Sequence, residues 1–225
     1  IDFYYDCDNN VISKNKINVT GMDNYLYGAG AIAHPTGGSG TTALNNMFVD
    51  NEIYVNGGYM AEGLVFGPGC NGTKALNNKV YLNADNVTYG VNLESSLNSV
   101  LMDNVISMQS DVVYGIEAYG SNGNIIESNT ISGEGKLVSG FVGVKTNNNI
   151  IQKNTITSDG SDADKSISRD VIKASNSGIY LEGASKGNFI DSNIITTKLG
   201  YPVDLSTDST GNTITNNYLK GSKGS

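Results

Sequence analysis

Pairs of tyrosine and glutamate side chains recur in this sequence at the same distance after a glycine. Glu117 and Tyr119 follow one glycine by two and four residues, and Tyr180 and Glu182 follow another in the same way. Alternate residues of a strand point to the same side of a sheet, so stacking these segments in register places all four on one outward strip. An aromatic face packs on a pyranose ring, and carboxylates accept hydrogen bonds from its hydroxyls. The four residues therefore predict a ligand-binding strip for a glycan.

The same alignment suggests a second kind of chemistry at Glu182 and Asp204. The two residues become diagonal neighbours on adjacent strands, with backbones about 7–8 Å apart. Carboxylates about 6.5–9.5 Å apart form the acid/base pair of inverting glycosidases. If the protein is an enzyme, Glu182 and Asp204 are its predicted catalytic pair. A solvated acidic face is the alternative, and the pattern favours it.

An acidic segment offers the best metal candidate. Asp159, Asp162 and Asp164 partly match the alternating oxygen ligands of a calcium loop, but the downstream glutamate of such loops is missing. A solvated loop is therefore favoured over calcium binding, and no cofactor is expected. The single histidine, His34, is expected in a loop rather than acting as a general base.

The two cysteines, Cys7 and Cys70, leave two alternatives open. A disulfide in an oxidising compartment requires Cα atoms within about 7 Å of each other. Two thiols outside any disulfide are favoured, because the residues are expected one to two repeat units apart.

Composition excludes several classes of protein. Charged residues make up 16% of the 225 residues and the net charge is -8, whereas nucleic-acid binding depends on lysine and arginine. No nucleic-acid partner is therefore expected. No apolar run reaches the 18 or more residues of a membrane-spanning helix, so direct insertion of this chain into a membrane is not expected either.

An eight-fold repeat organises the chain. Its pattern is Asn-x-apolar-x-x-Asn-x-apolar, as in NIIESNTI from Asn124 and NIIQKNTI from Asn149. The second asparagine is present in every copy, and stacked amides can form a hydrogen-bonded ladder. The predicted ladder consists of Asn15, Asn51, Asn83, Asn104, Asn129, Asn154, Asn193 and Asn217.

The repeat predicts an all-β solenoid, a parallel β-helix of about eight coils with 24–25 residues each. Ile126, Ile151, Ile190 and Ile214 are expected to stack in an inward column. Loops are expected at 35–44, 67–76 and 157–177. Residues 1–225 are expected to form a single domain from a longer surface protein, with 221–225 as a flexible tail.

These repeats resemble the right-handed parallel β-helices of the pectin-lyase-like superfamily, and most of all archaeal, methanogen-type adhesin-like surface proteins. They are also similar to periplasmic carbohydrate-binding β-helix proteins. The resemblance implies an extracellular, cell-surface protein whose partner is a glycan or a surface protein of another cell. The Gly-His-Gly and Arg-Ile-Lys motifs of the superfamily's polygalacturonases are absent from the sequence, which favours an adhesin over a carbohydrate-active enzyme. A structural stalk that binds nothing is the third alternative.

Overall fold

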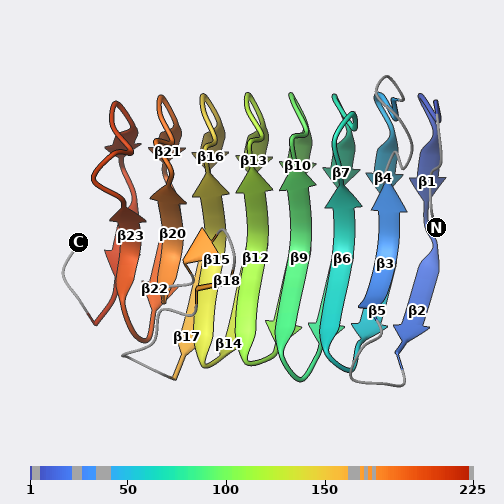
Figure 1. Ribbon diagram of the computed structural model, residues 1–225, viewed down its shortest axis with the longest axis horizontal. Coiled ribbons are helices and arrows are strands. Elements are labelled where there is room, and N and C mark those ends of the chain that lie inside the picture. The colour runs from blue at the N-terminus through green and yellow to red at the C-terminus, as the bar shows by residue number, and fades with distance from the viewer. Residues whose placement is uncertain are drawn as a thin grey trace.

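The described part of the chain is built from strands. The computed structural model describes residues 1, 6–21, 27–33, 42–161, 168–169, 172–173 and 176–222. Its strands form three long parallel sheets that run side by side along a rod (Figure 1). No described segment forms a helix that could cross a membrane. The predicted β-helix is confirmed.

The three sheets take their strands in rotation. The first sheet contains β1 (Val11–Ser13), β4 (Met47–Val49), β7 (Lys74–Leu76), β10 (Val100–Met102), β13 (Ile125–Glu127), β16 (Ile150–Gln152), β21 (Phe189–Asp191) and β24 (Thr213–Thr215). The second contains β2 (Lys16–Thr20), β5 (Glu52–Asn56), β8 (Lys79–Asn83), β11 (Val105–Gln109), β14 (Thr130–Gly135), β17 (Thr155–Gly160), β22 (Ile194–Thr197) and β25 (Tyr218–Lys220). The third contains β3 (Tyr27–Ala33), β6 (Met60–Phe66), β9 (Val87–Glu94), β12 (Val112–Tyr119), β15 (Leu137–Val144), β20 (Ser177–Glu182) and β23 (Tyr201–Leu205). A short antiparallel pair, β18 (Ser168–Arg169) and β19 (Ile172–Lys173), lies within the longest insertion.

The coil count and the loop positions differ slightly from expectation. The first two sheets have eight strands and the third has seven, so seven coils contain all three strands and the expected eight is slightly too high. Successive ladder asparagines are 24 to 27 residues apart except at two steps of 36 and 39. The sequence ranges expected to form loops at 35–44 and 157–177 fall within these two steps. Residues 35–41 and most of 161–175 lie outside the described residues, and 157–160 and Ser177 belong to strands β17 and β20. The third expected loop is correct for 67–73, but its last three residues form strand β7.

An aliphatic column fills the inside of the rod. Ile126 pairs in register with Ile151, and Ile151 with Ile190, and all three are at most 1% exposed. Ile214 continues the column but is 41% exposed, because β24 is the last described strand of its sheet. Each fully buried isoleucine contributes about 1.5–3 kcal/mol relative to an exposed one.

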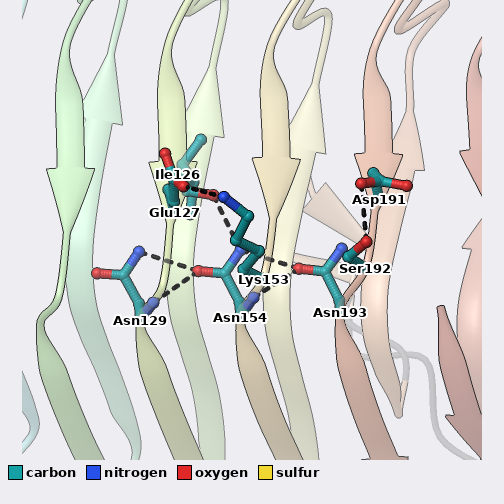
Figure 2. A network of polar contacts seen from close by, with 8 residues as sticks. All are labelled: Ile126, Glu127, Asn129, Lys153, Asn154, Asp191, Ser192 and Asn193. Carbon is teal, nitrogen blue, oxygen red and sulfur yellow. Dashed lines mark hydrogen bonds and ion pairs between the residues drawn. The ribbon is translucent and has the colours of Figure 1, made fainter. Parts of the chain in front are cut away.

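An asparagine ladder closes the corner between the first two sheets. Asn154 donates to the Asn193 Oδ1 at 3.0 Å and accepts a 3.0 Å bond from Asn129 (Figure 2). The residue before each ladder asparagine, such as Lys153 at φ 56°, adopts the left-handed backbone. The turn therefore comes from that preceding residue, while the asparagine ties adjacent coils together.

One ladder residue was assigned wrongly from the sequence. Asn78, not Asn83, bonds Asn51 and Asn104 in the third coil. Asn83 lies exposed at the end of β8, where it donates to the Asn56 Oδ1 at 3.0 Å. The third repeat begins at Thr73 rather than at an asparagine, and the sequence pattern therefore places this copy five residues too late. The other seven predicted ladder positions are confirmed.

Candidate functional site

The predicted strip of tyrosines and carboxylates lies in register on the outer side of the third sheet. Glu117 and Tyr180 each pair with Val142 across adjacent strands, and Tyr119 and Glu182 each pair with Val144. The strip is not openly exposed, however. Glu117 and Tyr180 are each only 8% exposed, and Val142 is fully buried between them.

An apolar cluster surrounds the strip and explains its burial. Val142, Val144 and Tyr180 pack with other apolar side chains of this face, and Tyr119 packs against them half-buried. The Tyr180 hydroxyl donates to the Glu182 Oε2 at 2.9 Å. Burial, reinforced by this hydrogen bond, raises the pKa of Tyr180. Alternation in the sequence predicted which way these residues point but not how far that face is covered.

The proposed acid/base pair has the predicted register. Tyr180 pairs with Asp204, so Glu182, two residues further along β20, is diagonal to Asp204. Glu182 is already engaged by the Tyr180 hydroxyl.

Burial perturbs a carboxyl group of the strip. It raises the pKa of Glu117 to about 7, and the negative charges of Glu62 and Glu94 add to the shift. Burial likewise raises the pKa of Glu62, while a hydrogen bond to Asn92 opposes this shift. The outer side of the third sheet therefore holds a protonatable glutamate near neutral pH.

The Glu117 shift predicts a specific pH dependence of stability. Between the usual value of 4.5 and about 7, the folded protein keeps a proton on Glu117 that the unfolded chain releases. The contribution of Glu117 to the free energy of unfolding is therefore greatest below about pH 4.5. It falls by at most about 3 kcal/mol as the pH rises to about 7. Urea unfolding should show that Glu117→Gln is more stable than wild type at pH 8 and loses less stability between pH 5 and 8. Parallel pH profiles for the two proteins would contradict the assignment.

A second surface, which sequence reasoning missed, is a groove of 710 Å³ along the outer side of the second sheet. We call it the tyrosine groove. It is lined by residues of β2, β5, β8, β11, β14 and β17, namely Asn18, Val19, Thr20, Tyr54, Val55, Asn56, Tyr81, Leu82, Asn83, Ser107, Met108, Gln109, Ser132, Gly133, Glu134, Thr157 and Asp159. Its volume falls within the range of small-molecule sites, about 300–1,000 Å³.

Two stacked tyrosines stand in this groove. The ring centroids of Tyr54 and Tyr81 are 4.9 Å apart with the planes 16° from parallel. The Tyr54 hydroxyl donates to Glu52, and this bond, with smaller effects of burial and neighbouring charge, raises the pKa of Tyr54 to about 12. The Lys16 ammonium lies 5.3 Å from the centre of the Tyr54 ring. The pair is therefore held in place before any ligand binds.

A row of polar side chains runs beside the tyrosines, one from each coil. Asn56, Asn83, Gln109, Glu134 and Asp159 are register partners on consecutive strands. Consecutive strands are about 4.8 Å apart, so the row presents amide and carboxylate groups at a regular spacing. Each residue of this row is the fifth residue after a ladder asparagine. An alignment of the repeats on their ladder asparagines reveals the row from sequence alone.

Of the predicted metal ligands, the structure describes Asp159. Asp159 lies in the tyrosine groove, where the Lys198 Nζ is 2.8 Å from its Oδ1. Asp162, Asp164 and His34 lie outside the described residues. Among the residues that are described, no group of three or more histidine, cysteine, aspartate or glutamate side chains could hold a metal ion.

Cys7 and Cys70 line the core and are not joined by a disulfide. Cys7 bonds through its backbone to Thr42, and the adjoining Ala43 bonds to Gly69. The coil that contains Ala43 thus separates the cysteines by about 10 Å, beyond disulfide reach. Burial raises the pKa of the Cys70 thiol to about 12.

Comparison with known proteins identifies the family. Residues 63–224, most of the chain from β6 to β25, match the family described as periplasmic copper-binding protein (NosD). No curated protein and no solved structure matches the chain significantly. The match includes most of the repeats that build the rod, and the chain therefore belongs to the NosD family of parallel β-helix proteins.

Proposed function

We propose that this protein is a carbohydrate-binding β-helix domain of the cell envelope, which holds a glycan in the tyrosine groove and acts as an adhesin. The observation that carries the proposal is the stacked Tyr54–Tyr81 pair beside a row of amide and carboxylate groups. The family's periplasmic description supports an envelope location. Presentation at the cell surface to another cell's glycan is part of the proposal.

The face of Tyr81 toward β11 is the expected sugar contact. The other face of Tyr81 is covered by Tyr54, and Tyr54 is in turn contacted by Lys16. On the β11 side, Tyr81 pairs in register with Ser107, and Ser107 with Ser132. These small hydroxyl side chains leave room for a pyranose ring against the tyrosine, where sugars characteristically pack.

Neighbouring polar groups complete this subsite. Asn83 and Gln109 are exposed two residues beyond Tyr81 and Ser107 on the same side of the sheet. Their amides can both donate to and accept from sugar hydroxyls. Because the coils hold these groups on a rigid sheet, binding orders few side chains and loses little conformational entropy.

Copper binding does not fit the described residues. Copper sites use cysteine, methionine and histidine ligands, and the metal-binding form of cysteine is the thiolate. The raised pKa of buried Cys70 disfavours its thiolate, and Cys7 is two coils away. The described residues provide no group of three histidine, cysteine, aspartate or glutamate side chains that could hold a metal ion, so the proposal assigns no role to copper.

Replacing Tyr81 tests the proposal directly. Tyr81→Ala should weaken binding of neutral oligosaccharides by about tenfold, because it removes the stacking surface. Isothermal titration calorimetry with β-1,4-linked hexasaccharides of glucose, mannose and xylose measures the change. The matched control is Tyr59→Ala, a 39% exposed tyrosine outside the groove, which should bind as wild type does.

The same titrations separate the rival functions. Oligosaccharides should remain intact after long incubation, since an adhesin has no turnover. Release of new reducing ends that Glu182→Gln abolishes would establish the glycosidase alternative instead. Equal affinities for wild type and Tyr81→Ala would remove the tyrosine groove as the site.

A further inference from the structure

One end of the tyrosine groove is acidic. The charged residues that line it are Glu134 and Asp159, on β14 and β17. An adjoining hollow of 440 Å³ shares these two carboxylates and adds two aspartates, Asp85 and Asp111, and two lysines, Lys136 and Lys198. The remainder of the lining is neutral, with amide, hydroxyl and apolar side chains.

Both lysines of the adjoining hollow already pair with acidic side chains. The Lys198 Nζ lies 2.8 Å from the Asp159 Oδ1, and the Lys136 Nζ lies 2.6 Å from the Asp111 Oδ2. Glu134 is exposed and lies beyond 4 Å ion-pair distance of the described lysines. Its negative charge still contributes, after the larger effect of Asp159, to the raised pKa of Lys198. The two hollows together hold four carboxylates, Asp85, Asp111, Glu134 and Asp159, and two ammonium groups. This end of the groove therefore has a net negative charge, and both of its nearby cations are engaged.

We infer that the tyrosine groove selects neutral glycans and rejects polymers of uronic acids, with Glu134 as the specificity-determining residue. This inference rests on the proposed function and names its substrate class. A sugar carboxylate seated near Glu134 would meet a like charge, with Lys136 and Lys198 already engaged. Placing like charges together at an interface suppresses binding of the wrong partner.

A neutral sugar meets no such opposition. Its hydroxyls donate to the Glu134 carboxylate and exchange hydrogen bonds with the amides of Asn83 and Gln109. These three groups lie in one row across consecutive strands. Successive units of an extended chain can therefore meet equivalent partners from coil to coil.

Affinity at two ionic strengths tests the inference. The ligands are the β-1,4-linked hexasaccharides of glucose, mannose and xylose, with hexagalacturonate as the charged counterpart. At about 0.01 M salt, where charges act over about 30 Å, the best neutral ligand should bind wild type at least about tenfold more tightly than hexagalacturonate. At about 1 M salt, where that length is about 3 Å, the difference should shrink severalfold.

Substitution of Glu134 provides the second readout. Glu134→Gln should keep the affinity for the neutral hexasaccharide within about twofold of wild type and bring the affinity for hexagalacturonate closer to that value. Glu134→Lys should reverse the preference at low salt, so that hexagalacturonate binds more tightly. The matched control, Asp103→Lys, makes the same charge change at an exposed corner outside the groove and should leave the preference intact.

The outcomes distinguish the inference from the proposed function. If the neutral hexasaccharides bind in a way that depends on Tyr81, but with the same affinity as hexagalacturonate, the neutral-glycan inference is overturned and the proposed function stands. Binding to none of these oligosaccharides would overturn both. A preference that Asp103→Lys shifts as strongly as Glu134→Lys would show that net charge, not the groove, sets it.

Discussion

Replacement of Ile151 with Asp should destabilise the rod by about 5 kcal/mol or more, enough to unfold it. Ile151 is fully buried between Ile126 and Ile190 of the neighbouring coils. The substitution leaves a cavity in the column and places an unpaired carboxylate in it. Total stabilities of domains are about 5–15 kcal/mol, so loss of the cooperative transition in circular dichroism is the expected result.

Ile150→Asp is the matched control, one residue earlier in β16. Ile150 points outward and is 37% exposed, so the same chemical change there should cost less than about 2 kcal/mol. Similar melting curves for the two variants would contradict the alternation of inward and outward side chains on which the fold rests.

Replacement of Asn154 with Ala should cost about 3 kcal/mol. The Asn154 Nδ2 donates to the backbone oxygen of Ile126 at 2.9 Å, and its Oδ1 accepts from the backbone nitrogen of Asn129 at 2.9 Å. Alanine leaves both backbone groups buried without these partners and also breaks the side-chain link to Asn193 (Figure 2). Urea unfolding with an unchanged m-value measures this loss.

Lys153→Ala controls for the corner itself. Lys153 forms a 2.8 Å ion pair with Glu127 at the surface, and exposed pairs of this kind contribute about 0–1 kcal/mol. Both alanine and lysine carry a Cβ in the left-handed backbone of this position, so strain changes little. Equal losses at positions 153 and 154 would contradict the structural role of the ladder.

The fold was predictable from sequence because each coil repeats the same physical requirements. An inward apolar residue and a ladder asparagine return in every unit, as at Ile126 and Asn129, which is typical of a stacked solenoid. Where Thr73 replaces the first asparagine, the local pattern still matches five residues later, at Asn78 and Asn83, although Asp85 there replaces the last apolar residue. The hydrogen bonds of Asn78 to Asn51 and Asn104 in the neighbouring coils set the register of that coil. The sequence of one repeat alone does not reveal this register.

The candidate site was less predictable, for two physical reasons. The strip around Glu117 and Tyr180 has the predicted direction, but the extent of its burial depends on tertiary packing. The tyrosine groove combines Tyr54 and Tyr81 with small neighbours such as Ser107, and each residue taken alone is an ordinary outward position of a strand. Only the stacking of six strands makes their shared hollow visible.

The side-chain amide NMR resonances of wild-type protein, titrated with the neutral hexasaccharide that binds best, test the central claim most directly. The amides of Asn56, Asn83 and Gln109 should shift with saturation, because they line the tyrosine groove. Those of the buried ladder, such as Asn104, should stay unchanged. If the resonances of the groove amides do not shift, and shifts are confined to resonances around Tyr119 on the third sheet, glycan binding in the tyrosine groove is contradicted.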